Sequence, residues 1–131
     1  MTESGRRLSA GDVLRRYRDE ELPEFWGRPL DSVSEVGLFG SQPIHVAAVR
    51  GDLDELNALL DGGSDVNAIG EKGHTPLHEA VGQEHVAAVQ LLLARGARID
   101  VKNEWGETPM DVAQMHERED LIELLEKARP E

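Results

Sequence analysis

The chain has 131 residues, no cysteine and a formal net charge of −12. Without cysteine it can form no disulfide and use no thiolate chemistry, and so acidic a surface repels the phosphates of nucleic acids and anionic lipids. No apolar run is long enough for a secretory signal or a membrane-spanning helix. We therefore expect a cytoplasmic protein that binds neither nucleic acid nor membrane.

Residues 1–37 are predicted to form a polar tail followed by a helical N-terminal cap. Ser9 is a suitable N-cap for a helix that reaches about Glu21. Three apolar residues share one side of that helix: Val13, Leu14 and Tyr17. A proline at position 23 disfavours its continuation. The passage from 24 to 37 is apolar, but its pattern predicts no definite secondary structure.

Residues 38–131 repeat with a period of 33. The period aligns residues of the same type in three successive units: Gly40, Gly73 and Gly106; Pro43, Pro76 and Pro109; Ala47, Ala80 and Ala113; Leu59, Leu92 and Leu125. Internal repetition at this length is typical of stacked repeats. The units are placed at about 38–69, 70–102 and 103–131, and residues 1–37 are expected to cover the first of them.

Each unit is predicted to contain two short helices. In the first unit one helix covers residues 44–49, Gly51 turns the chain, and leucines at 53, 56, 59 and 60 form the stripe of a second helix. Threonine before proline favours a helix start, since the hydroxyl can cap and proline fits the first position. In the third unit Glu126 replaces a leucine on the stacking face, which suits a last repeat.

The second unit carries the most specific motif, Thr75-Pro76-Leu77-His78-Glu79-Ala80. With the 33-residue period, this motif means that residues 38–131 resemble the ankyrin repeat family. The resemblance implies an all-α solenoid of helix-turn-helix units with short β-turn or hairpin connections. It also implies that the first helices line a concave surface, and that the protein binds other proteins without catalysis or cofactor.

His45 and His78 occupy the same place in successive units. The resemblance gives this histidine a structural role, in which its ring bonds the motif threonine and nearby backbone. Gln42 replaces that threonine in the first unit. His74 and His78 are four residues apart, but Thr75-Pro76 places the helix start between them, so we expect no metal site. No nucleophile motif or phosphate-binding glycine loop is present, and we expect no enzyme.

Candidate protein-binding residues follow from the places that family members use, which are the turn tips and the exposed ends of the first helices. They are Leu38, Phe39, Ser41, Val49, Arg50, Ile69, Glu71, Lys72, His74, Gln83, Lys102, Glu104, Trp105, Glu107, Met115 and His116. Phe39 and Trp105 lie two periods apart and could anchor an interface. The structural alternatives are that Phe39 packs under the N-terminal segment and that Trp105 covers its own turn.

Two functions fit these features. The first is a non-catalytic protein-binding module that acts as an adaptor or as a subunit of a complex. The second is an acidic inhibitor or immunity-type protein that occludes a basic enzyme such as a toxin, because the charge of −12 would steer a cationic partner toward it. In either case we expect a monomer or a weak dimer.

Overall fold

The structure is a computed structural model that describes residues 7–129. Over these residues it contains seven α-helices, two short 3₁₀-helices and no strand, so the predicted all-α class is confirmed. In chain order the elements are α1 (Ala10–Asp19), η1 (Pro23–Phe25), α2 (Pro43–Arg50), α3 (Leu53–Asp61), η2 (Glu71–Gly73), α4 (Pro76–Gly82), α5 (Val86–Ala94), α6 (Pro109–Met115) and α7 (Glu119–Lys127).

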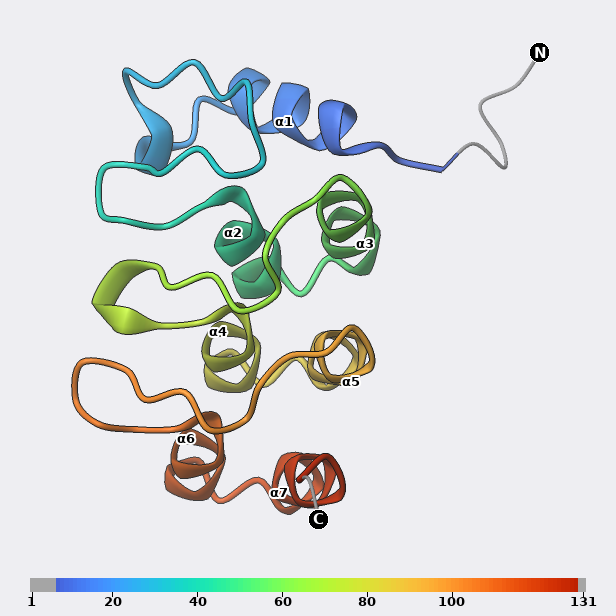
Figure 1. The fold of residues 1–131 in the computed structure, drawn as a ribbon, viewed down its shortest axis with the longest axis vertical. Helices are drawn as coiled ribbons and strands as arrows, with labels where there is room; N and C mark the ends of the chain where they lie inside the picture. Colours follow the sequence, from blue (N-terminus) through green and yellow to red (C-terminus); the bar gives the residue numbers. More distant parts are fainter. Residues whose placement is uncertain (1–6, 130–131) are drawn as a thin grey trace.

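The six helices that follow α1 stack in two parallel rows (Figure 1). An inner row holds α2, α4 and α6, and an outer row holds α3, α5 and α7. The inner row packs more closely than the outer one. Its alanines explain this, since Ala47, Ala80 and Ala113 are fully buried and have no bulk to hold neighbouring helices apart. Leucines such as Leu59 and Leu92 fill the wider outer gap.

Local sequence fixes where each inner helix begins. Proline stands at the first position of α2, α4 and α6, where its missing N–H costs no helical hydrogen bond. In α4 and α6 the preceding threonine caps the helix by accepting a bond from a backbone N–H, at 3.3 Å from His78 and 3.2 Å from Asp111. These caps place the helix starts at the same offset in each repeat.

Three equivalent loops project beyond the inner row (Figure 1). We call residues 37–41 loop 1, residues 70–74 loop 2 and residues 103–107 loop 3. The N–H of the first residue of each loop donates to the carbonyl of the fifth, at 2.8, 2.8 and 2.9 Å. The fourth residue is a glycine with positive φ in every loop, a conformation that glycine adopts without steric cost. The N–H of that glycine also donates to the carbonyl of the first loop residue, at 3.1, 3.1 and 3.0 Å, so each turn is closed by at least two backbone hydrogen bonds.

The N-terminal cap covers the first repeat. Helix α1 lies across α2 and α3 (Figure 1), with Ala10 next to Gly62 at the end of α3. Ser9 caps it in a reciprocal pair with Asp12. It ends at Asp19, slightly before the predicted boundary. The predicted stripe of Val13, Leu14 and Tyr17 is buried against the first repeat.

A buried polar network joins the cap to the repeats. The Glu55 side chain is fully buried, and it accepts hydrogen bonds from the Tyr17 hydroxyl at 2.6 Å and from Arg16 at 2.8 Å. Arg50 lies 3.4 Å from the same carboxylate and 4.9 Å from the Tyr17 ring centroid, and it also pairs with Glu20. Burial and the bond to Glu55 raise the pKa of Tyr17 far above its ordinary value, so the hydroxyl remains a donor.

The passage from 24 to 37 is irregular apart from the end of η1. It is held by burial of Phe25 and Leu30, and by Arg18, which donates to the Leu30 carbonyl at 2.7 Å. These contacts join residues that are distant from one another in sequence, which explains why no local pattern predicted the conformation.

Candidate protein-binding surface

Two buried histidines hold the loops in register. In His78, Nδ1 accepts from the Thr75 backbone N–H at 3.1 Å, so Nε2 carries the proton and donates to the Glu107 carbonyl at 2.9 Å. The ring thus links α4 to loop 3 of the next repeat. The expected bond to the motif threonine is present too, with 2.9 Å between the Thr75 hydroxyl and Nδ1.

His45 performs the same task without the threonine. Its Nδ1 accepts from the Gln42 backbone N–H at 2.9 Å, and its Nε2 donates to the Ala68 carbonyl at 2.8 Å, just before loop 2. Gly70 lies so close that a Cβ there would be 2.7 Å from Nε2. Burial lowers the pKa of His45 and of His78, which favours the neutral rings that this bonding requires.

Further bonds connect neighbouring loops. The Glu71 N–H donates to the Ser41 hydroxyl at 3.2 Å, and the Glu104 N–H donates to the Lys72 carbonyl at 3.1 Å. In loop 3 the buried Asn103 side chain accepts from the N–H groups of Trp105 and Glu107, at 3.0 and 2.9 Å. The loops therefore form a bonded series that presents their tips at fixed positions.

Large apolar side chains are exposed on these loops and at the ends of the inner helices. Phe39 and Trp105 are 62% and 61% exposed. The other predicted contacts of this kind that are exposed are Leu38, Val49, Ile69 and Met115. The alternative that Phe39 packs under the N-terminal segment is wrong, given its exposure. Soluble proteins rarely leave apolar side chains grouped in this way except at binding sites.

Trp105 leans toward loop 2 of the preceding repeat. Its ring centroid lies 6.1 Å from that of His74, and the Lys72 ammonium lies 5.9 Å from the ring centroid. His74 in turn stacks on His78 at 5.5 Å. The ring therefore contacts the loop of the preceding repeat, which the alternative of covering only its own turn does not include, and it is still 61% exposed.

The remaining predicted contacts divide into two groups. Six polar or charged residues are exposed: Glu71, Lys72, Gln83, Lys102, Glu104 and His116. Four are engaged within the protein: Ser41 is buried under loop 2, Arg50 belongs to the cap network, His74 bonds Glu79 at 3.1 Å, and Glu107 accepts from Asn103 at 2.9 Å. The exposed members are thus divided between the loops and the C-terminal ends of α4 and α6, where Gln83 and His116 lie, while Ser41 is buried. As partner contacts, all of them remain predictions.

Beneath the loops lies a hollow that we call the inner groove. Its volume is about 230 Å³, and its walls include Glu24, Val46, Val49, Arg50, Glu71 and Glu79. The buried His45 also lines it. The groove is formed jointly by the cap segment, two inner helices and loop 2, so its shape depends on the stacking of the first two repeats.

Sequence reasoning missed Glu24, Val46 and Glu79 as parts of this surface. Glu79 occupies the same repeat offset as Val46 and Val112, so it is an acid at an otherwise apolar inner position. That substitution was a usable signal. No sequence signal identified Glu24, because it lies outside the repeated region and reaches the groove only through the fold of the cap.

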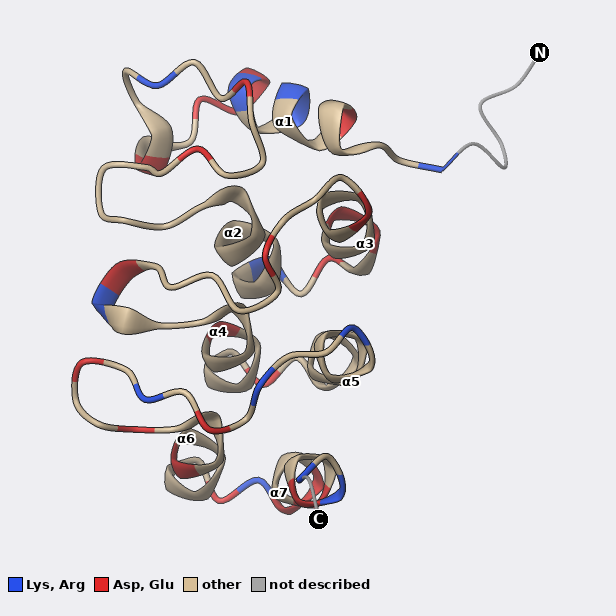
Figure 2. Cartoon of the chain, in the orientation of Figure 1, with Lys and Arg blue, Asp and Glu red and all other residues tan. Residues whose placement is uncertain are grey.

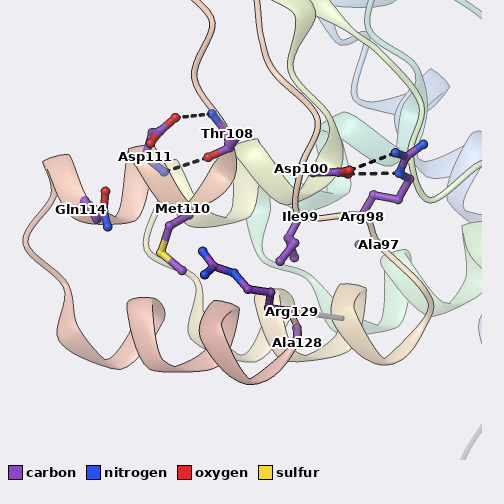
Figure 3. A pocket seen from close by; sticks show the side chains of 10 residues that line it. All are labelled: Ala97, Arg98, Ile99, Asp100, Thr108, Met110, Asp111, Gln114, Ala128 and Arg129. Atoms are coloured by element: carbon purple, nitrogen blue, oxygen red, sulfur yellow. Dashed lines mark hydrogen bonds and ion pairs between the residues drawn. The ribbon is translucent and has the colours of Figure 1, made fainter. Parts of the chain in front are cut away.

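A larger hollow of about 780 Å³ lies between α6, α7 and the segment that follows α5 (Figure 3). Ala97, Ile99, Met110 and Ala128 provide apolar lining. Two of its acids have partners, since Arg98 forms two bonds of 3.1 Å with Asp100, and Asp111 is in the capping pair with Thr108. Its polar groups are thus largely satisfied within the chain.

Acidic residues occur in loops 2 and 3 and in both helix rows, whereas loop 1 carries no charge (Figure 2). Among the described residues, two arginines bind acids of the preceding repeat. Arg95 pairs with Asp61 at 2.9 Å, and Arg118 pairs with Glu84. These two arginines therefore form ion pairs between neighbouring repeats.

The part of the chain that the structure describes contains no group of three or more His, Cys, Asp or Glu side chains suited to hold a metal ion. His74 and His78 bind different partners, as set out above. Over the same residues, no helix combines the length and apolar character needed to cross a bilayer.

Stacked helix pairs with bonded loops and exposed side chains along one edge define a repeat solenoid built to present a surface. A family model of three ankyrin repeats matches residues 44–130. The chain therefore belongs to the ankyrin repeat family, whose repeats are general protein–protein interaction modules. A search of curated proteins found no match.

Proposed function

We propose that this protein is a non-catalytic module that binds another protein through the loop tips and the inner groove, as an adaptor or as a subunit of a complex. The observation that carries the proposal is the group of exposed apolar side chains on the loops, with Phe39 and Trp105 foremost. Aromatic residues of this kind supply much of the binding energy of interfaces.

The rigidity of the loops supports this role. Loop backbones are bonded to one another and to buried histidines, so their tips need little ordering when a partner arrives. A preorganised surface loses less conformational entropy on binding, which leaves more of the contact energy as affinity.

The experiment compares two apolar truncations. Trp105→Ala removes the proposed anchor, and Leu53→Ala removes an exposed leucine at the start of α3 in the outer row, 39% exposed. Each tagged variant is used to capture proteins from the cells that naturally produce it, and bound proteins are quantified by mass spectrometry. We expect Trp105→Ala to lose specific partners at least about tenfold, as for a hot-spot residue. Equal capture by both variants, with unchanged folding, would contradict the proposed surface.

A second candidate is an inhibitor that occludes a basic enzyme. The net charge of −12 favours it, because complementary charge accelerates the encounter with a cationic partner. Its distinguishing property is the salt dependence of association. A captured partner whose association rate falls steeply above about 0.15 M salt, and whose activity is abolished by the complex, would support the inhibitor. A salt-insensitive rate and a partner that remains active would support the adaptor.

A further inference from the structure

The inner groove contains carboxylates that have no cationic partner. Among the described residues no lysine or arginine forms an ion pair with Glu24, Glu71 or Glu79. The Glu79 carboxylate is hydrogen-bonded to the Nδ1 atom of His74, at 3.1 Å, and the Glu79 side chain is 20% exposed. Arg50, the one arginine in the groove wall, is already bound to Glu20 and Glu55. The negative charge of the groove therefore lacks compensation within the described residues.

Some carboxylates elsewhere on the repeats do have a cationic partner. Asp61, Glu84 and Asp120 each bind an arginine, and so does Asp100 in the segment after α5. Other acids of the repeats, such as Asp54 and Glu123, likewise form no ion pair with lysine or arginine among the described residues, but they are exposed. Glu79 differs from them because its side chain is partly buried in the groove. A partly enclosed carboxylate attracts a cation more strongly than a fully solvated one, because water screens it less.

Apolar surface lies on either side of this charge. Repeat equivalence places Val46, Glu79 and Val112 at one offset of the inner helices, and Val49 and Met115 at another. Directly packed helices are about 8–10 Å apart. Val46 is buried, so the exposed apolar surface is supplied by Val49 on α2 and Met115 on α6. Glu79 lies on α4 between them, about 10 Å from each neighbouring helix.

We propose that the inner groove binds a segment of another protein in which a lysine or arginine lies between Glu71 and Glu79, flanked by apolar residues that contact Val49 and Met115. This rests on the proposed function and adds the chemistry of its partner. A separation of about 10 Å corresponds to about three residues of an extended segment or seven of a helix. The volume of about 230 Å³ admits a single long side chain rather than a folded element.

Glu79→Gln tests the charge and leaves the local structure intact. Glutamine has nearly the same shape, and its carbonyl oxygen can still accept the bond from His74. The matched control is Glu123→Gln, which removes one charge from an exposed position of α7 outside the groove. Any effect of net charge alone appears equally in both variants.

The probe is a library of random linear peptides displayed on phage and selected against the immobilised full chain. We expect enrichment of peptides with a lysine or arginine and apolar residues three or seven positions away. Their affinity should fall about tenfold or more in Glu79→Gln and remain unchanged in Glu123→Gln, as for the loss of a desolvated charge pair.

Three results would overturn the inference. The first is enrichment of peptides that lack a basic residue and that bind Glu79→Gln but not Trp105→Ala. This result would overturn the inference about the groove but would support the proposed binding surface. The second is an equal loss of peptide affinity in Glu79→Gln and Glu123→Gln, which would show that the effect comes from net charge alone. Selection of no peptide at all would show that the groove does not recognise a short segment, and partner capture through Trp105 would then decide the proposed function separately.

Discussion

Lowering the pH is expected to destabilise the stack through two histidines. His45 and His78 are almost fully buried, at 1% and 2% exposed, and each bridges to the next repeat. Protonation adds a hydrogen to Nδ1, which already faces the backbone N–H of Gln42 or Thr75. Two donors would then oppose one another in a site shielded from water, so the bridge cannot retain its geometry.

The sign and size of the effect follow from linkage. Burial lowers the pKa of both rings, while hydrogen bonds to backbone carbonyls raise it less. Nearby Glu79 favours protonation of His45, and nearby His74 opposes that of His78. Below the unfolded pKa of about 6.5 the unfolded chain binds more protons than the folded one, so stability is lost as the pH falls. Two such groups cost at most about 2 kcal/mol between pH 6.5 and 5.5, the limit reached when neither folded ring takes up a proton in that range.

The assay is urea denaturation followed by circular dichroism at several pH values from about 7.5 to 5.5, a range above the ordinary pKa of Asp and Glu. A His45→Gln, His78→Gln double variant should be less stable at neutral pH but should lose most of the pH dependence. His116→Gln, which changes an exposed residue next to Glu84, serves as the control. The same slope in the wild type and the double variant would refute the assignment to these rings.

Two further substitutions test packing and the cap. Tyr17→Phe removes the hydroxyl that donates to buried Glu55 at 2.6 Å, and should lower the free energy of unfolding by about 1.5–3 kcal/mol, as for a hydrogen bond to a charged group; unchanged stability in thermal denaturation would show that the arginines alone satisfy the carboxylate. Gly70→Ala places a Cβ against the His45 ring and should cost about 1–3 kcal/mol by overpacking. Gly82→Ala is its control, because that Cβ would meet nothing within 4 Å, and similar denaturation midpoints for the two variants would contradict the proposed clash.

The repeat region could be predicted from the sequence because its determinants are local. Proline and the residue before it fix each inner helix start, and the observed helix Pro43–Arg50 differs by one residue at each end from the predicted 44–49. Glycine at the fourth loop position fixes the turn. These signals lie within a few residues of the structure that they determine, and the period of 33 confirms each one three times.

Within the N-terminal cap, only helix α1 could be predicted from the sequence. A glutamate in the outer helix α3 has the pattern of a surface residue, yet Glu55 is fully buried because Tyr17 and Arg16 reach it from 38 and 39 residues away. No local sequence pattern predicts this contact between distant residues. The conformation of residues 24–37 likewise depends on long-range burial of Phe25 and Leu30, so it required the structure.

The binding surface depends on another property of the repeats, namely the places where they differ. A position that packs against a neighbour meets the same environment in every unit, so its residue type should recur, as at Ala47, Ala80 and Ala113. The tips carry phenylalanine, lysine and tryptophan at one offset, and the groove carries glutamate where valine stands in the other two units. A repeat position whose residue type varies between units is therefore expected to lie on the surface. Gln42 shows why coordinates are still needed, since it replaces a threonine but its backbone still supplies the bond to His45. Glu79 differs as well, and its partly buried carboxylate forms no ion pair with lysine or arginine among the described residues, which is why we propose that this difference serves a partner.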